Sequence, residues 1–297
     1  MRRVVDFFWG PADPRSYALV RIGLSVAALA NLIQLWPLRH EYFATSGMLA
    51  LDAARTTASG RWYGSIFYVV TSPAGVTAVF VVAAAAMIGL GAGVAMRLCA
   101  FVVWAWHVSY SDRAFPILHS WDALLRIGSL LVMVSPLGRL WSLAHVLRPR
   151  ASDAESVPIY GLRLMRWQLI VVYVTTLWLK LPDEYWRNGQ VCAYFSVSIY
   201  STTPNSTLLV RHEWMSALQT YLSLAIEAAV PWLLLAKRTR VAGFAAGGAL
   251  HFAIAVTSIL AVFSICMLPG YLSFLDGDDI DRAWAFARRQ RARFGPI

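Results

Sequence analysis

The chain has 297 residues, of which 58% are hydrophobic and only 14% are charged, and its mean hydropathy is +0.55. Soluble domains carry about 25% charged residues, so this composition excludes an ordinary soluble protein and predicts an integral membrane protein. The formal net charge is +10 at pH 7. Because the basic residues stand beside apolar runs and do not form one patch, we expect no nucleic-acid partner.

Apolar runs along the chain predict an all-α fold, a polytopic helical bundle. About 20 helical residues cross the roughly 30 Å hydrocarbon core of a bilayer, and by this measure we expect about eight membrane-spanning helices. The predicted spans are roughly 16–36, 74–96, 98–111, 120–137, 162–181, 214–236, 241–256 and 259–275.

The last two spans come from one apolar stretch, residues 241–275, which is too long for a single crossing. We divide it near Ser258 and expect Pro269 to kink or end the final helix, because proline lacks a backbone N–H. The sequence has no Gly/Ser-rich linker, low-complexity tract or internal repeat. It therefore predicts one domain over residues 1–297.

The distribution of arginine predicts the orientation, since cytoplasmic loops carry an excess of Lys and Arg. With the N-terminus inside, the inner segments hold most of the 26 basic residues, so both termini are predicted to be cytoplasmic. The C-terminal sequence DDIDRAWAFARRQRARF is then either an inner-surface segment attracted to anionic lipid or a solvated tail.

Two predicted outer segments, residues 37–73 and 182–213, are long and rich in Trp and Tyr, and we expect them to be structured or functional. The inner loop, residues 138–162, has the composition of a plain connector. The three cysteines are far apart and form no CxxC pair, so the sequence predicts neither a redox pair nor a metal site.

Ionisable side chains inside or at the ends of membrane spans are costly and are therefore functional candidates. They are Arg21, His119, Asp122, Arg126, Lys180, Glu227 and His251. Asp122 and Arg126 are four residues apart and share a helix face, which predicts a structural ion pair, with contact to a ligand as the alternative. Glu227 is expected to be a counter-ion for Arg21, Arg126 or His251, or else part of a site.

Lys180 is the most informative of these residues, because 24 of the 26 basic residues are arginines and the other lysine, Lys237, lies in a basic cluster. At the end of an apolar helix, Lys180 either extends its ammonium to the headgroups or is covered by the next segment, which contains Trp186. A covered lysine becomes able to take a proton near neutral pH.

His119 opens the fourth predicted span, and the alternating topology places it at the same outer face as Lys180. It is either a helix-end surface residue or a group that handles protons. His251, deeper in its span, is predicted to line the floor of a shared cavity.

The motifs around these residues resemble those of the vitamin K-dependent γ-carboxylase superfamily, specifically its bacterial branch of horizontally transferred transmembrane (HTTM) proteins. They occur in order from about Arg15 to Leu275. They are YFATSG, LHSWDALL, SPLGRLWSL, QLIVVYVTTLWLKLPDEYWRNG, the pair Glu227 and Pro231, RTR, ALHF and AVFSICML.

The resemblance implies a role for several residues. In the carboxylase a lysine deprotonates reduced vitamin K, oxygenation produces a strong base, and that base removes a γ-proton from peptide glutamate, which then takes up carbon dioxide. Lys180 looks equivalent to that lysine, and His119 to a histidine of the same site. By resemblance only, His251, Trp121 and Trp186 are expected to contact a reduced quinone, and the protein is expected in a bacterial inner membrane.

Two departures from the carboxylase pattern bear on function. Leu118 stands where the animal carboxylase has a polar residue, and only about twenty residues follow the last span. We therefore do not expect protein carboxylation from this chain. The first hypothesis is a quinol-dependent oxygenase or carboxylase-like enzyme with an outward-facing hydrophobic pocket. The alternative is a non-enzymatic membrane factor for maturation of a secreted peptide, and a transporter comes third because no internal repeat is found.

Overall fold

The structure is a computed structural model of the chain, and it describes residues 2–57, 64–202 and 206–294. Helices make up most of these residues, which confirms the all-α prediction. A small addition is the antiparallel pair of two-residue strands β1 (Pro11–Ala12) and β2 (Val157–Pro158).

The chain divides into two compact units, which are described separately. Unit 1 comprises Met1–Met165 with Leu268–Ile297, and unit 2 comprises Arg166–Met267. The expectation of a single domain stays a prediction.

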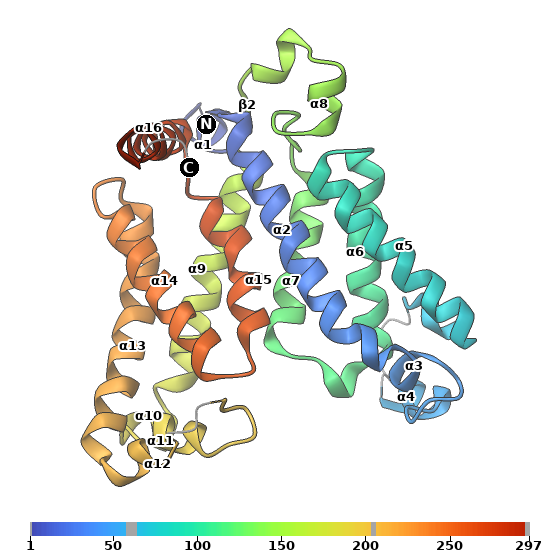
Figure 1. Cartoon of the computed structure of the whole chain (residues 1–297), viewed down its shortest axis with the longest axis vertical. Helices are drawn as coiled ribbons and strands as arrows, with labels where there is room; N and C mark the ends of the chain where they lie inside the picture. The colour runs from blue at the N-terminus through green and yellow to red at the C-terminus, as the bar shows by residue number, and fades with distance from the viewer. Residues whose placement is uncertain (1, 58–63, 203–205, 295–297) are drawn as a thin grey trace. The chain divides into compact units, whose positions relative to one another are not determined.

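In unit 1 the long helix α2 packs against α5 and α7, and α6 packs against both α5 and α7 (Figure 1). The helices of this unit are α1 (Arg2–Trp9), α2 (Pro14–Leu35), η1 (Trp36–Leu38), α3 (Arg39–Phe43), α4 (Leu51–Thr57), η2 (Ile66–Tyr68), α5 (Pro73–Ala92), α6 (Met96–Arg113), η3 (Phe115–Ile117), α7 (Ser120–Val134), α8 (Leu143–Leu147), η4 (Ala151–Ala154) and α16 (Gly277–Phe294).

In unit 2 the helices α13 and α14 pack side by side, and the short helices α11 and α12 pack against α13 (Figure 1). The helices of this unit are most of α9 (Tyr160–Lys180), α10 (Glu184–Arg187), α11 (Val191–Ser196), α12 (Ser206–Arg211), α13 (Glu213–Leu235), α14 (Arg240–Thr257) and the first half of α15 (Ala261–Leu272).

Each predicted span coincides with a helix of the structure, namely α2, α5, α6, α7, α9, α13, α14 and α15. Within the described residues, four helical segments are long and apolar enough to cross a membrane: Pro14–Phe43, Pro73–Ala92, Glu213–Leu235 and Arg240–Thr257. The protein is therefore a multi-pass membrane protein, and the count of eight spans stays a prediction.

Local sequence signals explain where these helices begin and end. Asp13 caps α2 by accepting a hydrogen bond from the backbone N–H of Arg15 at 2.8 Å, and Pro14 occupies the first helical turn. The predicted division near Ser258 is confirmed, because this residue is extended between α14 and α15. Pro269 does not end the last helix early but lies inside α15.

Arg21 is buried at 1% exposure, where its guanidinium binds the end of another helix. Its Nη1 donates to the carbonyl oxygens of Leu90 at 2.6 Å and Gly91 at 2.8 Å, and its Nη2 donates to that of Trp141 at 3.1 Å. The last carbonyls of a helix have no partner within the helix and carry partial negative charge, so a cation there is favourable. Arg21 thus binds the end of α5, and the expectation that it pairs with Glu227 was wrong.

The inner loop is more ordered than the plain connector that its composition predicts. It contains α8, η4 and β2, and its centre is the carboxylate of Asp153, which is 2% exposed. His145 Nδ1 lies 2.8 Å from Oδ2, Arg139 Nε lies 2.9 Å from Oδ1, and the backbone N–H of Arg150 donates to Oδ2 at 3.1 Å. The hydrogen bond from His145, with the Arg150 N–H and the Arg139 charge, lowers the pKa of Asp153 below its usual range.

We expect the folded inner loop to lose this support in acid. A depressed carboxyl pKa contributes stability above the unfolded value of about 3.9, and that contribution disappears as the pH falls through the lower folded-state value. The variant Asp153→Asn should therefore open the loop at pH 7, seen as faster proteolysis between α7 and α9. The difference from the parent should shrink below about pH 4. A difference that persists unchanged in acid would contradict the role of the charge, and Asp52→Asn on the exposed helix α4 is the matched control.

Candidate functional site

Lys180 and Glu227 form an ion pair in unit 2. Lys180 is the last residue of α9, and Glu227 lies in α13, one turn before Pro231. Nζ donates to Oε1 at 2.6 Å and to Oε2 at 2.7 Å. The side chains are 22% and 11% exposed, so the ammonium is turned to a carboxylate and not extended to headgroups. Glu227 is therefore the partner of Lys180, and the expected partners Arg126 and His251 were wrong.

Trp186 covers the ammonium of Lys180. Asp183 caps the short helix α10 by accepting hydrogen bonds from the backbone N–H groups of Tyr185 at 3.0 Å and Trp186 at 3.2 Å. This turn places the indole ring with its centroid 4.3 Å from Nζ of Lys180, a cation–π contact. The predicted return of this segment over Lys180 is present in the structure.

The segment that carries Trp186 is held to α13 by side-chain hydroxyls. The carbonyl oxygen of Gly189 accepts hydrogen bonds from Ser216 Oγ at 2.8 Å and Thr220 Oγ1 at 3.2 Å, and Tyr221 Oη donates to the carbonyl of Arg187 at 2.6 Å. Gly189 has φ +72°, and a Cβ at this position would lie 2.8 Å from Ala217 Cβ. Only glycine fits both this conformation and this approach of the backbone to α13.

Cys192 is a neighbour of the ion pair that the sequence analysis did not single out. Burial raises the pKa of its thiol, while the Thr220 hydroxyl and the positive charge of Lys180 act in the opposite direction. The thiol therefore stays neutral, as a small polarizable group beside the charges. Cys192 carried no sequence signal, because an isolated cysteine in a loop has no spacing to mark it.

His251 is buried in the same unit and pairs with a tyrosine of α9. Its Nε2 shares a hydrogen bond of 3.0 Å with Tyr173 Oη, and its backbone carbonyl accepts one from Ser264 Oγ at 2.9 Å. Tyr173 precedes Lys180 on α9 by about two turns, or roughly 10 Å along the axis. The structure thus attaches His251 to the helix of Lys180 at a deeper level, and the shared cavity stays a prediction.

His119 and Trp121 form a stacked pair in unit 1. His119 is the N-cap residue of α7, and its imidazole stacks on the Trp121 indole with ring centroids 4.1 Å apart and an interplanar angle of 14°. The indole Nε1 donates to Asn31 Oδ1 at 3.0 Å, which fixes the Trp121 side of the stack. His119 itself is exposed, so the other face of its ring is open.

Asp122 closes the N-terminus of α7 and does not pair with Arg126. Its Oδ2 accepts a hydrogen bond from the backbone N–H of His119 at 2.6 Å, and its Oδ1 accepts from Tyr110 Oη and, at 3.4 Å, from Asn31 Nδ2. Among the described residues no ion pair joins Asp122 to Arg126, which is exposed. The predicted pair was wrong because the unsatisfied N–H groups of the first turn attract the carboxylate toward the start of the helix.

His107 is a further buried ionisable residue in a predicted span, and the sequence analysis did not name it. It is 0% exposed, and its Nδ1 donates to the carbonyl of Val103, one turn earlier on α6, at 2.7 Å. His251 was a candidate because it is an ionisable residue deep within a predicted span. The same criterion applies to His107. Its partner is a backbone carbonyl of its own helix, so its contacts indicate a structural role.

The predicted site residues thus fall into two groups. Unit 2 brings together Lys180 and Trp186 with Glu227, and it binds His251 to α9 through Tyr173. His119 and Trp121 are stacked in unit 1. The expectation that His119 and Lys180 share one cavity stays a prediction.

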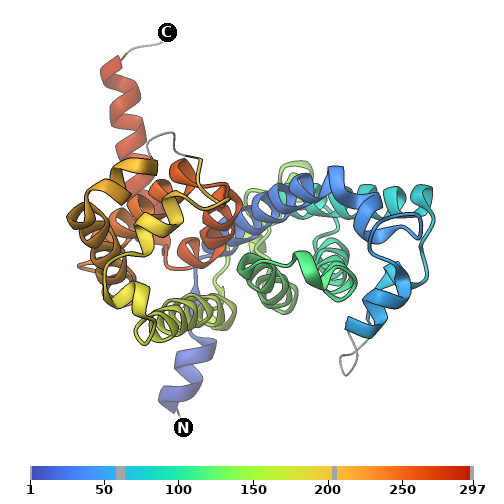
Figure 2. The ribbon, with the colours of Figure 1, turned by 90° about the horizontal axis from the view of Figure 1, so that it is seen from below.

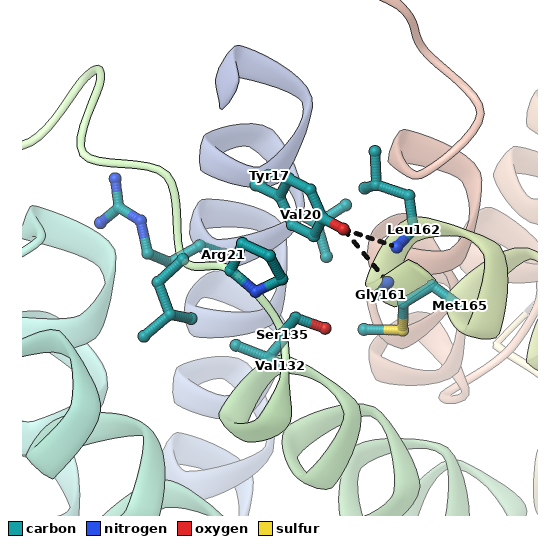
Figure 3. Close-up of a pocket in the computed structure, with 10 residues that line it drawn as sticks. Tyr17, Val20, Arg21, Val132, Ser135, Gly161, Leu162 and Met165 are labelled. Carbon is teal, nitrogen blue, oxygen red and sulfur yellow. Dashed lines mark hydrogen bonds between the residues drawn. The ribbon is translucent and has the colours of Figure 1, made fainter. Parts of the chain in front are cut away.

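A pocket in unit 1 is lined by Arg21 but contains none of the residues predicted to form a quinone site (Figure 3). Its volume is about 10 Å³, and it lies between the start of α2, the end of α7 and the start of α9, with Tyr17, Val132 and Met165 in its lining. Tyr17 Oη accepts from the N–H groups of Gly161 at 3.1 Å and Leu162 at 3.3 Å, which satisfies the first turn of α9. Small-molecule sites usually exceed about 300 Å³, so this pocket does not fit a quinone.

The chemistry open to the unit 2 group is proton transfer. An ammonium that is paired with a carboxylate has no lone pair and cannot act as a base. Transfer of one proton from Nζ to Glu227 gives a neutral amine beside a neutral acid, so the pair carries no net charge in either form. The pair can therefore supply a base without moving charge into or out of the membrane.

The sequence model of the HTTM domain family matches residues 9–278, most of the chain. Neither a curated protein nor a solved structure gives a significant match.

Removal of the negative charge of Glu227 should increase the reactivity of Lys180. In Glu227→Gln the neutral amine is favoured, and we expect roughly tenfold faster acylation of Nζ by an amine-reactive reagent at neutral pH. Peptide mass spectrometry can report both lysines, with the exposed Lys237 as an internal reference in every sample. Glu213→Gln, at the exposed start of the same helix, is the matched control, and equal acylation of Lys180 in parent and Glu227→Gln would refute the pair.

Gly189→Ala should displace the cover from Lys180. The positive φ and the 2.8 Å approach to Ala217 are incompatible with a Cβ, so we expect a loss of about 1–2 kcal/mol in the free energy of unfolding. Thermal unfolding in detergent measures the loss, and acylation of Lys180 should rise at the same time. Gly248→Ala is the control, because nothing lies within 4 Å of its added Cβ. A neutral Gly189→Ala variant would contradict the assigned backbone constraint.

Proposed function

The chain belongs to the HTTM domain family, and on this premise we propose that it is a quinol-dependent membrane enzyme of carboxylase-like type in which Lys180 is the proton-abstracting base. The observation that carries this proposal is the ion pair of Lys180 and Glu227 beneath Trp186. We place the protein in a bacterial cytoplasmic membrane with both termini inside, on the arginine distribution.

The residues around Lys180 fit a planar, weakly acidic ring compound. The centroid of the Trp186 ring lies 4.3 Å from Nζ of Lys180, and deeper along α9 Tyr173 is hydrogen-bonded to His251. A reduced quinone bound there supplies an acidic hydroxyl group and the electrons for oxygen chemistry. The protein residues that would contact it are Trp186 and His251, with Trp121 and the orienting partner His119 carried over from the sequence prediction.

The role of the protein in this chemistry is to move one proton in a dry environment. Glu227 takes a proton from the Lys180 ammonium, which leaves Nζ with a lone pair. The amine then accepts a proton from the acidic hydroxyl and returns to the ammonium form, while Glu227 holds the other proton. Trp186 restricts water at Nζ, which a strong oxygen-derived base requires.

A second candidate function has its own observation. The outer segment after Lys180 exposes apolar side chains, with Tyr185 49%, Tyr194 55% and Ile199 86% exposed. A surface of this kind also suits contact with a secreted peptide, in which case the protein is a non-enzymatic maturation factor and the ion pair is structural. Crosslinking of the purified protein followed by mass spectrometry separates the two: a stoichiometric peptide supports this function, and a bound quinone supports the enzyme.

Lys180→Arg tests the enzyme directly, because arginine keeps the charge and the pairing with Glu227 but stays protonated. We expect quinol-dependent oxygen uptake by membranes to fall by about 10²–10⁴-fold in Lys180→Arg and in Lys180→Ala. Lys237→Arg, at the other lysine, should leave uptake unchanged. Unchanged uptake in Lys180→Arg, or no quinol-dependent uptake in the parent, would remove the enzymatic proposal.

A further inference from the structure

The C-terminal helix α16 is fastened to the beginning of α2, within unit 1. Arg15 donates from Nη1 to Asp281 Oδ1 at 2.6 Å and from Nη2 to Oδ2 at 3.2 Å, and Ser16 Oγ donates to the carbonyl of Leu275 at 2.7 Å. The backbone N–H of Asp279 donates to Asp276 Oδ1 at 3.2 Å, which caps the helix. α16 therefore starts at the level where a membrane-spanning helix begins.

The direction of α16 differs from that of α2. Seen along the view of Figure 1, α2 runs down the unit while α16 is seen nearly end-on beside its start. In Figure 2, turned by 90°, α16 is seen along its length, so it runs across the direction that α2 takes in Figure 1. A helix with this direction lies along the surface of a membrane that α2 crosses.

The sides of α16 differ in character. At 100° per residue, Ala283, Trp284 and Ala287 form an apolar stripe on one side, while Arg282, Phe286 and Arg289 fall on the opposite side. Arg288 and Arg291 lie close to Trp284 around the helix, so their long side chains flank the stripe. Trp284 is 51% exposed, so this apolar face is largely uncovered by the protein. An edge contact between the rings of Trp284 and Trp141, with centroids 6.4 Å apart, borders it.

The charge of the helix indicates what covers that face. Beyond Asp281 the helix contains the arginines 282, 288, 289, 291 and 293 and no acidic residue. A helix with Trp284 on an apolar stripe, flanked by long arginine side chains, fits the boundary between headgroups and acyl chains, with its cations among anionic phosphates. A soluble acidic partner would use the arginines alone and leave Trp284 in water.

We propose that α16 is an interfacial helix that binds the anionic phospholipid headgroups of the membrane that the protein spans, on the side predicted to be cytoplasmic. Its apolar face enters the acyl boundary, and Arg288, Arg289 and Arg291 contact lipid phosphates. The inference is independent of the enzymatic proposal, because none of these residues takes part in the unit 2 group. The segment forms a helix, so it is not a frayed tail, and the contact with anionic lipid is what the proposal adds.

Hydrogen–deuterium exchange of the full chain in lipid nanodiscs tests the proposal. With phosphatidylcholine and phosphatidylglycerol mixed, the amides of residues 283–292 should exchange roughly tenfold more slowly than with phosphatidylcholine alone. Salt at about 0.5 M should remove the difference, because it shortens the range of the attraction.

The variant Arg288→Gln/Arg289→Gln/Arg291→Gln should lose the dependence on anionic lipid. The matched control is Arg148→Gln/Arg150→Gln, in the basic inner loop, which should keep that dependence in α16. Equal exchange in the two lipid compositions would overturn the proposal, as would slowing by anionic lipid that survives in the triple variant. Slowing by a soluble polyanion with no effect of anionic lipid would also overturn it, in favour of an acidic soluble partner.

Discussion

The pairing of Lys180 with Glu227 is the interaction on which the candidate site depends. Each charge alone would be costly at the end of an apolar helix or inside α13, and each makes the other tolerable. Two short contacts from one ammonium to both carboxylate oxygens give the pair a defined geometry. Trp186 covers the ammonium of this pair, and the hydroxyls of Ser216 and Thr220 hold the covering segment by binding the carbonyl of Gly189. Cys192 lies near the charge of Lys180.

Three other ionisable residues in the spans are bound by local structure. Arg21 binds the final carbonyls of α5, Asp122 caps α7, and His107 bonds to a carbonyl of its own helix. Helix ends leave backbone groups without partners, and these groups attract charged side chains. Because such residues already have a structural explanation, the ion pair at the end of α9 stands out as the place where charge is available for chemistry.

Sequence reasoning located most of the membrane helices to within a few residues, because apolar length and caps such as Asp13–Pro14 are local signals. It did not predict that Glu227 pairs with Lys180, which lies 47 positions earlier in the chain. Partner choice across a bundle depends on how each helix is rotated, and composition does not report rotation. The expected pair of Asp122 and Arg126 failed for a related reason, since periodicity showed a shared face but not the competition from the N-terminal N–H groups.

For the inner loop and the C-terminal segment too, the sequence indicated the local composition, and only tertiary contacts showed how the residues are ordered. Their composition indicated a connector for the first and, for the second, either a lipid-attracted surface segment or a solvated tail, whereas the contacts of Asp153 and of Arg15 with Asp281 order both. The sequence by itself determined the membrane class, the family, the positions of the helices and the unusual placement of Lys180, because these depend on hydrophobicity and motifs along the chain. Only the tertiary structure decided that Lys180 is paired and covered, since that outcome requires side chains from α9, α10 and α13 to meet in space.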